Sequence, residues 1–93
     1  MQLKIKFWNK VEVSTLTIEL IEGKKTGNLF LRLYTNDVNI FNKKLELDEA
    51  NVMKEKMDTI FDMAEEINTL YLNEQYDEFK KLSNKLMDTI KNL

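Results

Sequence analysis

The side chains that could take part in chemistry are almost all carboxylates, because the chain has 16 Asp and Glu residues but no His and no Cys. Without imidazoles and thiols, the usual general base, the thiolate nucleophile and the commonest transition-metal ligands are missing. Ser14 and Ser83 therefore have no imidazole partner that would activate them as nucleophiles. A pair of carboxylates can support acid–base catalysis, but no spacing in the sequence singles one out. We therefore expect that the protein is not an enzyme and that it uses no cofactor.

Five of the carboxylates fall on one side of a predicted helix. At about 100° per residue they span an arc of roughly 100°, opposite the apolar side of that helix. They are Glu55, Asp58, Asp62, Glu65 and Glu66. A solvated helix face is one explanation of this pattern. The functional alternative is a partner-binding surface that imitates nucleic-acid phosphates and docks on a basic groove of another protein. No metal site is expected, because carboxylate di-metal sites in helical bundles combine inward-facing Glu with His.

Cations and aromatic rings are interleaved in the N-terminal part of the chain. If the strands pair in a suitable register, one face of a sheet collects Lys4, Lys6, Trp8 and Arg32, together with Phe30 and Tyr34. Rings on which bases stack, beside cations that contact phosphates, are what single-stranded nucleic-acid binding requires. The simpler interpretation is that the rings are core residues and the lysines only keep the protein in solution. A net charge of −2 argues against strong nucleic-acid affinity, so nucleic acid is not the expected partner.

The elements that would position these groups change type along the chain, and the charge changes with them. Residues 1–44 alternate apolar and polar positions like β-strands and carry eight basic and four acidic side chains. Residues 45–93 repeat at helical spacing and carry six basic and twelve acidic side chains. We expect one α+β domain over residues 1–93, with a β part at 1–47 and a helical hairpin at 48–93. Its order is ββββαα: a four-stranded antiparallel meander followed by two antiparallel helices.

Local signals refine this arrangement. The apolar positions change phase after Ser14, which predicts a β-bulge there. Asp48 is a suitable N-cap for a first helix that ends near Leu72, and the second helix is expected to begin near Glu74.

The first predicted helix has more apolar surface than its own chain is expected to cover. About 23 helical residues span roughly 35 Å, whereas strands of about six residues span roughly 20 Å. Part of the apolar side would then meet a second copy, and we expect a homodimer. The residues expected in its seam are Met53, Ile60, Met63, Ile67 and Leu70. The alternative is that these residues belong to the core of a single chain.

The function that fits these patterns is binding rather than catalysis. No apolar run approaches the about 20 residues of a membrane span and no signal peptide is recognisable, so a cytoplasmic protein is expected. In size and composition the chain resembles many accessory proteins of phages and mobile elements, which often bind and block a host enzyme. We expect a non-enzymatic protein-binding module that inhibits a host nucleic-acid-handling defence protein through its acidic helical surface. The alternatives are a small nucleic-acid-binding protein or a structural or assembly factor.

Overall fold

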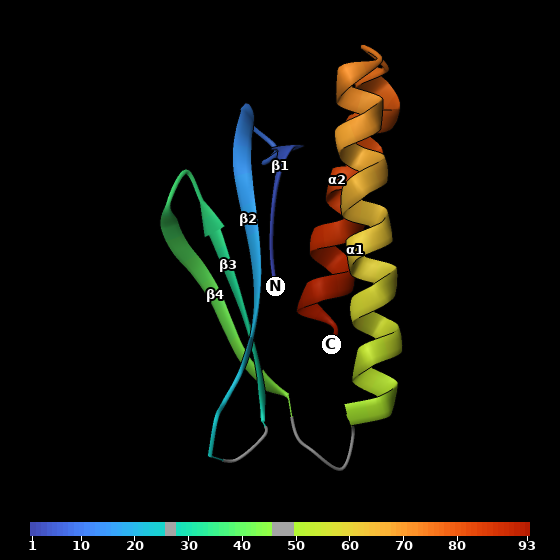
Figure 1. Ribbon diagram of the computed structural model, residues 1–93. Coiled ribbons are helices and arrows are strands. Elements are labelled where there is room, and N and C mark those ends of the chain that lie inside the picture. The colour runs from blue at the N-terminus through green and yellow to red at the C-terminus, as the bar shows by residue number, and fades with distance from the viewer. Residues whose placement is uncertain (26–27, 46–49) are drawn as a thin grey trace.

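The chain folds as four strands followed by two helices, the α+β order ββββαα that the sequence predicts (Figure 1). The computed structural model describes residues 1–25, 28–45 and 50–93, the last range with side chains from residue 54 onward. The strands are β1 (Gln2–Trp8), β2 (Val13–Glu22), β3 (Leu29–Thr35) and β4 (Val38–Leu45), and the helices are α1 (Ala50–Leu72) and α2 (Tyr76–Lys91). Each strand pairs antiparallel with its neighbour along the chain, so the sheet is a meander in the order β1-β2-β3-β4. The predicted N-cap Asp48 lies outside the described residues.

The molecule has two layers, because both helices lie on the same face of the sheet and leave the opposite face uncovered (Figure 1). Alternation along the strands turns one apolar set toward the helices, and burial of that set drives the layers together. The buried core consists of Ile5, Phe7, Leu16, Ile18, Leu31, Leu33 and Leu45 from the sheet, with Met57, Ile60, Phe61, Ala64, Ile67, Phe79, Leu86 and Ile90 from the helices.

The connection between β1 and β2 is a turn organised by the side chain of Asn9. Its Oδ1 accepts the N–H groups of Val11 at 3.0 Å and Glu12 at 2.8 Å, and its own N–H donates to the Glu12 carbonyl at 3.1 Å. β2 therefore begins only at Val13, and it pairs with β1 in one unbroken register. The predicted bulge at Ser14 is wrong. Val11 belongs to the turn, and Ser14 itself takes a buried position in β2.

A bulge does occur, but in the last strand. Leu33 pairs with Phe41 while the next residue, Tyr34, pairs with Asn39, so Ile40 has no partner in the ladder. The side-chain amide of Asn39 donates to the Leu33 carbonyl at 3.2 Å. Because β4 is an edge strand, this bulge twists the exposed edge and makes strand addition less favourable. Ile40 is left 47% exposed.

The sheet is longer than the sequence suggested. β2 has 10 residues and spans about 33 Å, close to the roughly 35 Å of the 23-residue α1. α1 packs against α2 and β1, and this packing buries its apolar side within one chain. The helical hairpin still extends beyond the sheet at the end where α1 joins α2 (Figure 1).

α1 ends in a turn in which Glu74 adopts a left-handed backbone conformation, with φ of 59°. The Gln75 N–H donates to the Leu70 carbonyl at 2.9 Å, and the Glu74 N–H donates to the Tyr71 carbonyl at 3.1 Å. This pair of bonds is a Schellman motif, which satisfies the last carbonyls of a helix. α2 then begins at Tyr76, slightly later than predicted and without a side-chain cap.

The turn between β3 and β4 is tied to the start of β2. The Asn36 N–H donates to the Thr15 carbonyl at 2.9 Å, and its Oδ1 accepts the Thr15 N–H at 3.0 Å. The β1–β2, β3–β4 and α1–α2 turns therefore lie toward the same end of the molecule (Figure 1). We call this the turn end.

Candidate protein-binding surfaces

The five acidic residues of α1 form an exposed surface on the side of the helix away from the core. This acidic face consists of Glu55, Asp58, Asp62, Glu65 and Glu66, all of them exposed. None of the five is ion-paired with another residue that the structure describes. The hydroxyls of Thr59 and Thr69, on the same helix, donate to the backbone carbonyls of the residues one turn earlier. They therefore do not bind the carboxylates of the acidic face. α1 therefore offers five unpaired negative charges on a rigid support.

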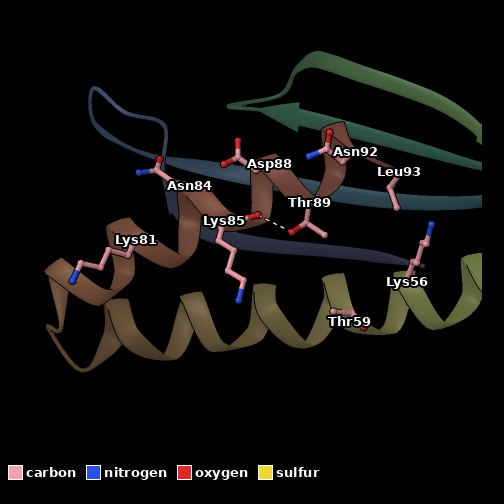
Figure 2. Close-up of a pocket in the computed structure, with 9 residues that line it drawn as sticks. All are labelled: Lys56, Thr59, Lys81, Asn84, Lys85, Asp88, Thr89, Asn92 and Leu93. Atoms are coloured by element: carbon pink, nitrogen blue, oxygen red, sulfur yellow. Dashed lines mark hydrogen bonds between the residues drawn. The ribbon is translucent and has the colours of Figure 1, made fainter.

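A groove of about 630 Å³ runs along one border of the acidic face, between α1 and α2. Figure 2 shows Lys85 extending from α2 toward α1, with Lys56 rising from α1 and Lys81 one turn before Lys85. Asp88 is the only acid in this lining, and its side chain points away from α1 (Figure 2). The groove is therefore basic, although it lies beside an acidic surface.

The lysines between the helices lie close to only one part of the acidic face. Closer to the turn end, the hollow between the helices is lined by Glu66 and Glu78 together with Lys81 and Lys85. Opposite charges at such short range weaken each other's field even in a partly aqueous setting. Asp58, Asp62 and Glu65 line neither hollow, so these lysines screen them less than they screen Glu66.

The uncovered sheet face brings together most of the predicted nucleic-acid group. Continuous pairing of β1, β2 and β3 places Lys4, Lys6 and Arg32 on this face with Phe30 and Tyr34. A groove of about 410 Å³ there is bordered by Phe30, Arg32, Tyr34, Asn39, Asn42 and Lys44.

Three features of the sheet face oppose nucleic-acid binding. Glu19 lies directly across from Arg32 in the register, so an acid occupies the middle of the basic group. Phe30 and Tyr34 are half-buried rather than open platforms for stacking. The Lys6 ammonium also donates to the Thr15 hydroxyl at 3.1 Å.

Trp8 is separated from the rest of that group and lies against the helical layer. The Lys80 ammonium of α2 is 4.3 Å from the centroid of its ring, and the ring packs against the core. Its backbone N–H donates to the Ser83 hydroxyl at 3.0 Å. Trp8 therefore joins the edge of the sheet to α2 and is not placed with Lys4 and Lys6 to stack a base.

The residues expected in the dimer seam are divided between the interior and the surface of one chain. Ile60 and Ile67 have no exposed surface, because the sheet and α2 cover them. Met63 and Leu70 are half-buried against the same core. The side chain of Met53 lies outside the described residues. A homodimer stays a prediction, but Ile60 and Ile67 cannot meet a second copy of this fold.

The reactive groups do not converge on one site. Ser83 is fully buried and accepts a hydrogen bond from Trp8, whereas the Ser14 hydroxyl is buried without a partner among the described residues. Over residues 1–25, 28–45 and 50–93, no three carboxylates come close enough together to hold a metal ion. In the same ranges, neither helix is long and apolar enough to cross a membrane.

No known protein family matches the chain, and neither the curated proteins nor the solved structures include a match.

The sequence predicts the acidic face but not the basic groove beside it. Lys81 and Lys85 lie one turn apart, which is visible in the sequence. Lys56 faces the same groove only because α1 and α2 pack side by side, and no local pattern indicates that pairing.

Proposed function

We propose that the protein is a non-enzymatic binding module whose acidic face docks on a basic surface of another protein. The partner class that fits best is a nucleic-acid-handling protein, whose basic groove normally holds phosphates. Occupation of that groove would block the nucleic acid, so the module acts as an inhibitor. With a host defence enzyme as the target, it would act in the cytoplasm as an anti-defence factor of a phage or mobile element.

The observation that carries this proposal is the unpaired state of the acidic face. Three of its members, Asp58, Asp62 and Glu65, follow each other at one-turn spacing on exposed helix. A row of carboxylates on a rigid helix can engage Arg bidentately and Lys as a point charge. Charge complementarity of this kind mainly raises the association rate and weakens with salt.

The proposal is tested by capture in competition with a polyanion. The immobilised protein is incubated with a host lysate, with and without an excess of heparin or of short duplex DNA. We expect a protein with a basic nucleic-acid groove to be captured, and the polyanion to displace it because both compete for one site. A captured protein that stays bound in excess polyanion would show that the module does not occupy such a groove.

A second candidate function is binding of single-stranded nucleic acid on the uncovered sheet face. The shared face of Lys4, Lys6 and Arg32 favours it. The acid at Glu19 and the displacement of Trp8 toward α2 count against it. It therefore ranks second to the protein-binding role.

A further inference from the structure

A small cleft opens between the sheet and α2, and its charged lining groups are both basic. Its volume is about 200 Å³, enough for one large apolar side chain. Phe7, Trp8, Ile40 and Met87 supply apolar walls, and Lys10 and Lys91 are the two charged residues of the lining. A complementary occupant would carry an apolar side chain flanked by acids.

A residue with an unsatisfied acceptor also lines this cleft. Asn84 lines both this cleft and the groove between α1 and α2, and its buried Oδ1 accepts no hydrogen bond from any described residue. A buried acceptor without a partner is costly, and an incoming N–H donor would relieve that cost. An occupant with an N–H donor near Asn84 would satisfy this acceptor, whereas the apolar walls and the two lysines define the rest of its chemistry.

The chain itself carries a segment of this chemistry at the α1–α2 turn. Leu72 is 71% exposed and Tyr76 is 47% exposed, so this turn presents two large apolar side chains to solvent. Three acids surround them, Glu74, Asp77 and Glu78, all exposed and none ion-paired with a described residue. The first turn of α2 has no side-chain cap, so its N–H groups are available as donors.

The turn of a molecule cannot reach the cleft of the same molecule. Tyr76 and Asn84 lie on one continuous helix, about 12 Å apart along its axis. The turn also belongs to the part of the hairpin that extends beyond the sheet (Figure 1). It is therefore exposed to other molecules and held away from its own cleft.

We propose that the occupant is a second copy of this chain, and that two molecules exchange their helical turns. Leu72 of each would enter the cleft of the other, with Glu74 facing Lys10. Such a contact is isologous, since the same two patches meet twice about a two-fold axis. It does not use Ile60 or Ile67, and it leaves the acidic face of α1 free.

The test is sedimentation velocity over a range of protein concentration, at about 50 mM and about 500 mM salt. We expect a species of twice 11.1 kDa at low salt that weakens about tenfold or more at high salt. Lys10→Glu and Glu74→Lys each place like charges in both contacts, so each variant alone should be monomeric. Lys10 and Glu74 lie outside the helices and already have positive φ. The two substitutions therefore change the charge and leave the helix termini unaltered.

The decisive sample is an equal mixture of the two variants. In a Lys10→Glu and Glu74→Lys heterodimer, one contact is fully reversed and the other is wild type, so both are complementary and association should return. Lys24→Glu and Glu22→Lys, exposed positions away from both the cleft and the α1–α2 turn, are the matched controls and should associate like wild type.

Three results would overturn the proposal. They are a wild-type protein of 11.1 kDa at every concentration, single variants that still dimerise, or monomeric single variants whose mixture stays monomeric. Leu72→Ala provides an independent check, because this exposed side chain can be shortened without loss of core. It should weaken association by about tenfold.

Discussion

The backbone N–H of Trp8 donates a 3.0 Å hydrogen bond to the hydroxyl of Ser83, which lies 75 residues later in the chain. This bond joins the last residue of an edge strand to the buried side of α2. The Lys80 ammonium, one turn before Ser83, lies over the Trp8 ring. Together these contacts hold the helical layer, and with it the exposed acidic face, in one position relative to the sheet.

We expect Ser83→Ala to lower the free energy of unfolding by about 1–3 kcal/mol, because the Trp8 N–H loses its acceptor in a partly buried place. Urea denaturation measures this change. Thr69→Ala is the matched control, since its hydroxyl donates only to a carbonyl of its own exposed helix face. Equal effects of the two substitutions would show that the bond to Trp8 does not stabilise the fold.

Lys80→Ala should lower the free energy of unfolding by about 0.5–1 kcal/mol through loss of the cation–π contact. Because Trp8 is the only tryptophan, its fluorescence reports directly on the change. Lys81→Ala removes the same charge from the neighbouring position and serves as control. If both variants leave the emission of Trp8 unchanged, Lys80 does not rest on the ring in solution.

Ile60→Ala should destabilise the monomer by about 2–5 kcal/mol, because a fully buried side chain is replaced by a cavity. Met63→Ala, at a half-buried position of the same helix, should lower the free energy of unfolding by less than Ile60→Ala does. Thermal unfolding and the mass in solution are measured together. An Ile60→Ala protein that keeps its stability but changes its oligomeric mass would mean that Ile60 lies in a seam between two chains.

Single-stranded DNA and RNA should bind only weakly, with dissociation constants above micromolar at about 150 mM salt. The reason is the negative net charge of −2 and the position of Glu19 within the basic sheet face. Titration of labelled oligonucleotides gives the affinity. Sub-micromolar binding that disappears with Lys6→Ala and Arg32→Ala would make the sheet face the functional surface instead.

The order of strands and helices was predictable because the spacing of apolar residues within one element depends only on the type of that element. The spacing of Leu3, Ile5 and Phe7 predicts the buried side of β1, and the acids of α1 predict the exposed side of that helix. Neither prediction requires knowing which other element packs there. The start of β2 was not predictable in this way. The pattern of Val11 and Val13 is that of a strand, yet the side-chain bonds of Asn9 place Val11 in a turn.

The surfaces that depend on two elements were less accessible from the sequence. Trp8 alternates in phase with Lys4 and Lys6, but packing against α2 takes it away from them. Likewise, the apolar side of α1 is wide enough to suggest a second copy, and only the packing of α1 against α2 and β1 shows that one chain covers Ile60. The position of Trp8 and the burial of Ile60 follow from tertiary packing, which the spacing of residues within one element does not predict.

The central claim, that the acidic face of α1 docks on a basic partner, is tested most directly by charge reversal, with a control variant of the same net charge. One variant replaces Asp58, Asp62 and Glu65 by Lys, and its control makes the same change at Glu12, Glu22 and Asp37, exposed acids that lie on the sheet and its turns. Each Asp→Lys or Glu→Lys change adds two charges, so three changes take both variants from −2 to +4.

The captured partner is quantified by mass spectrometry, its association rate is measured by surface plasmon resonance, and circular dichroism confirms that both variants are folded. We predict that the α1 variant loses the partner through a slower association rate, whereas the control variant keeps most of it. A folded α1 variant that captures the partner as well as wild type does would contradict the claim, and the acidic face would then be only a solvated side of α1.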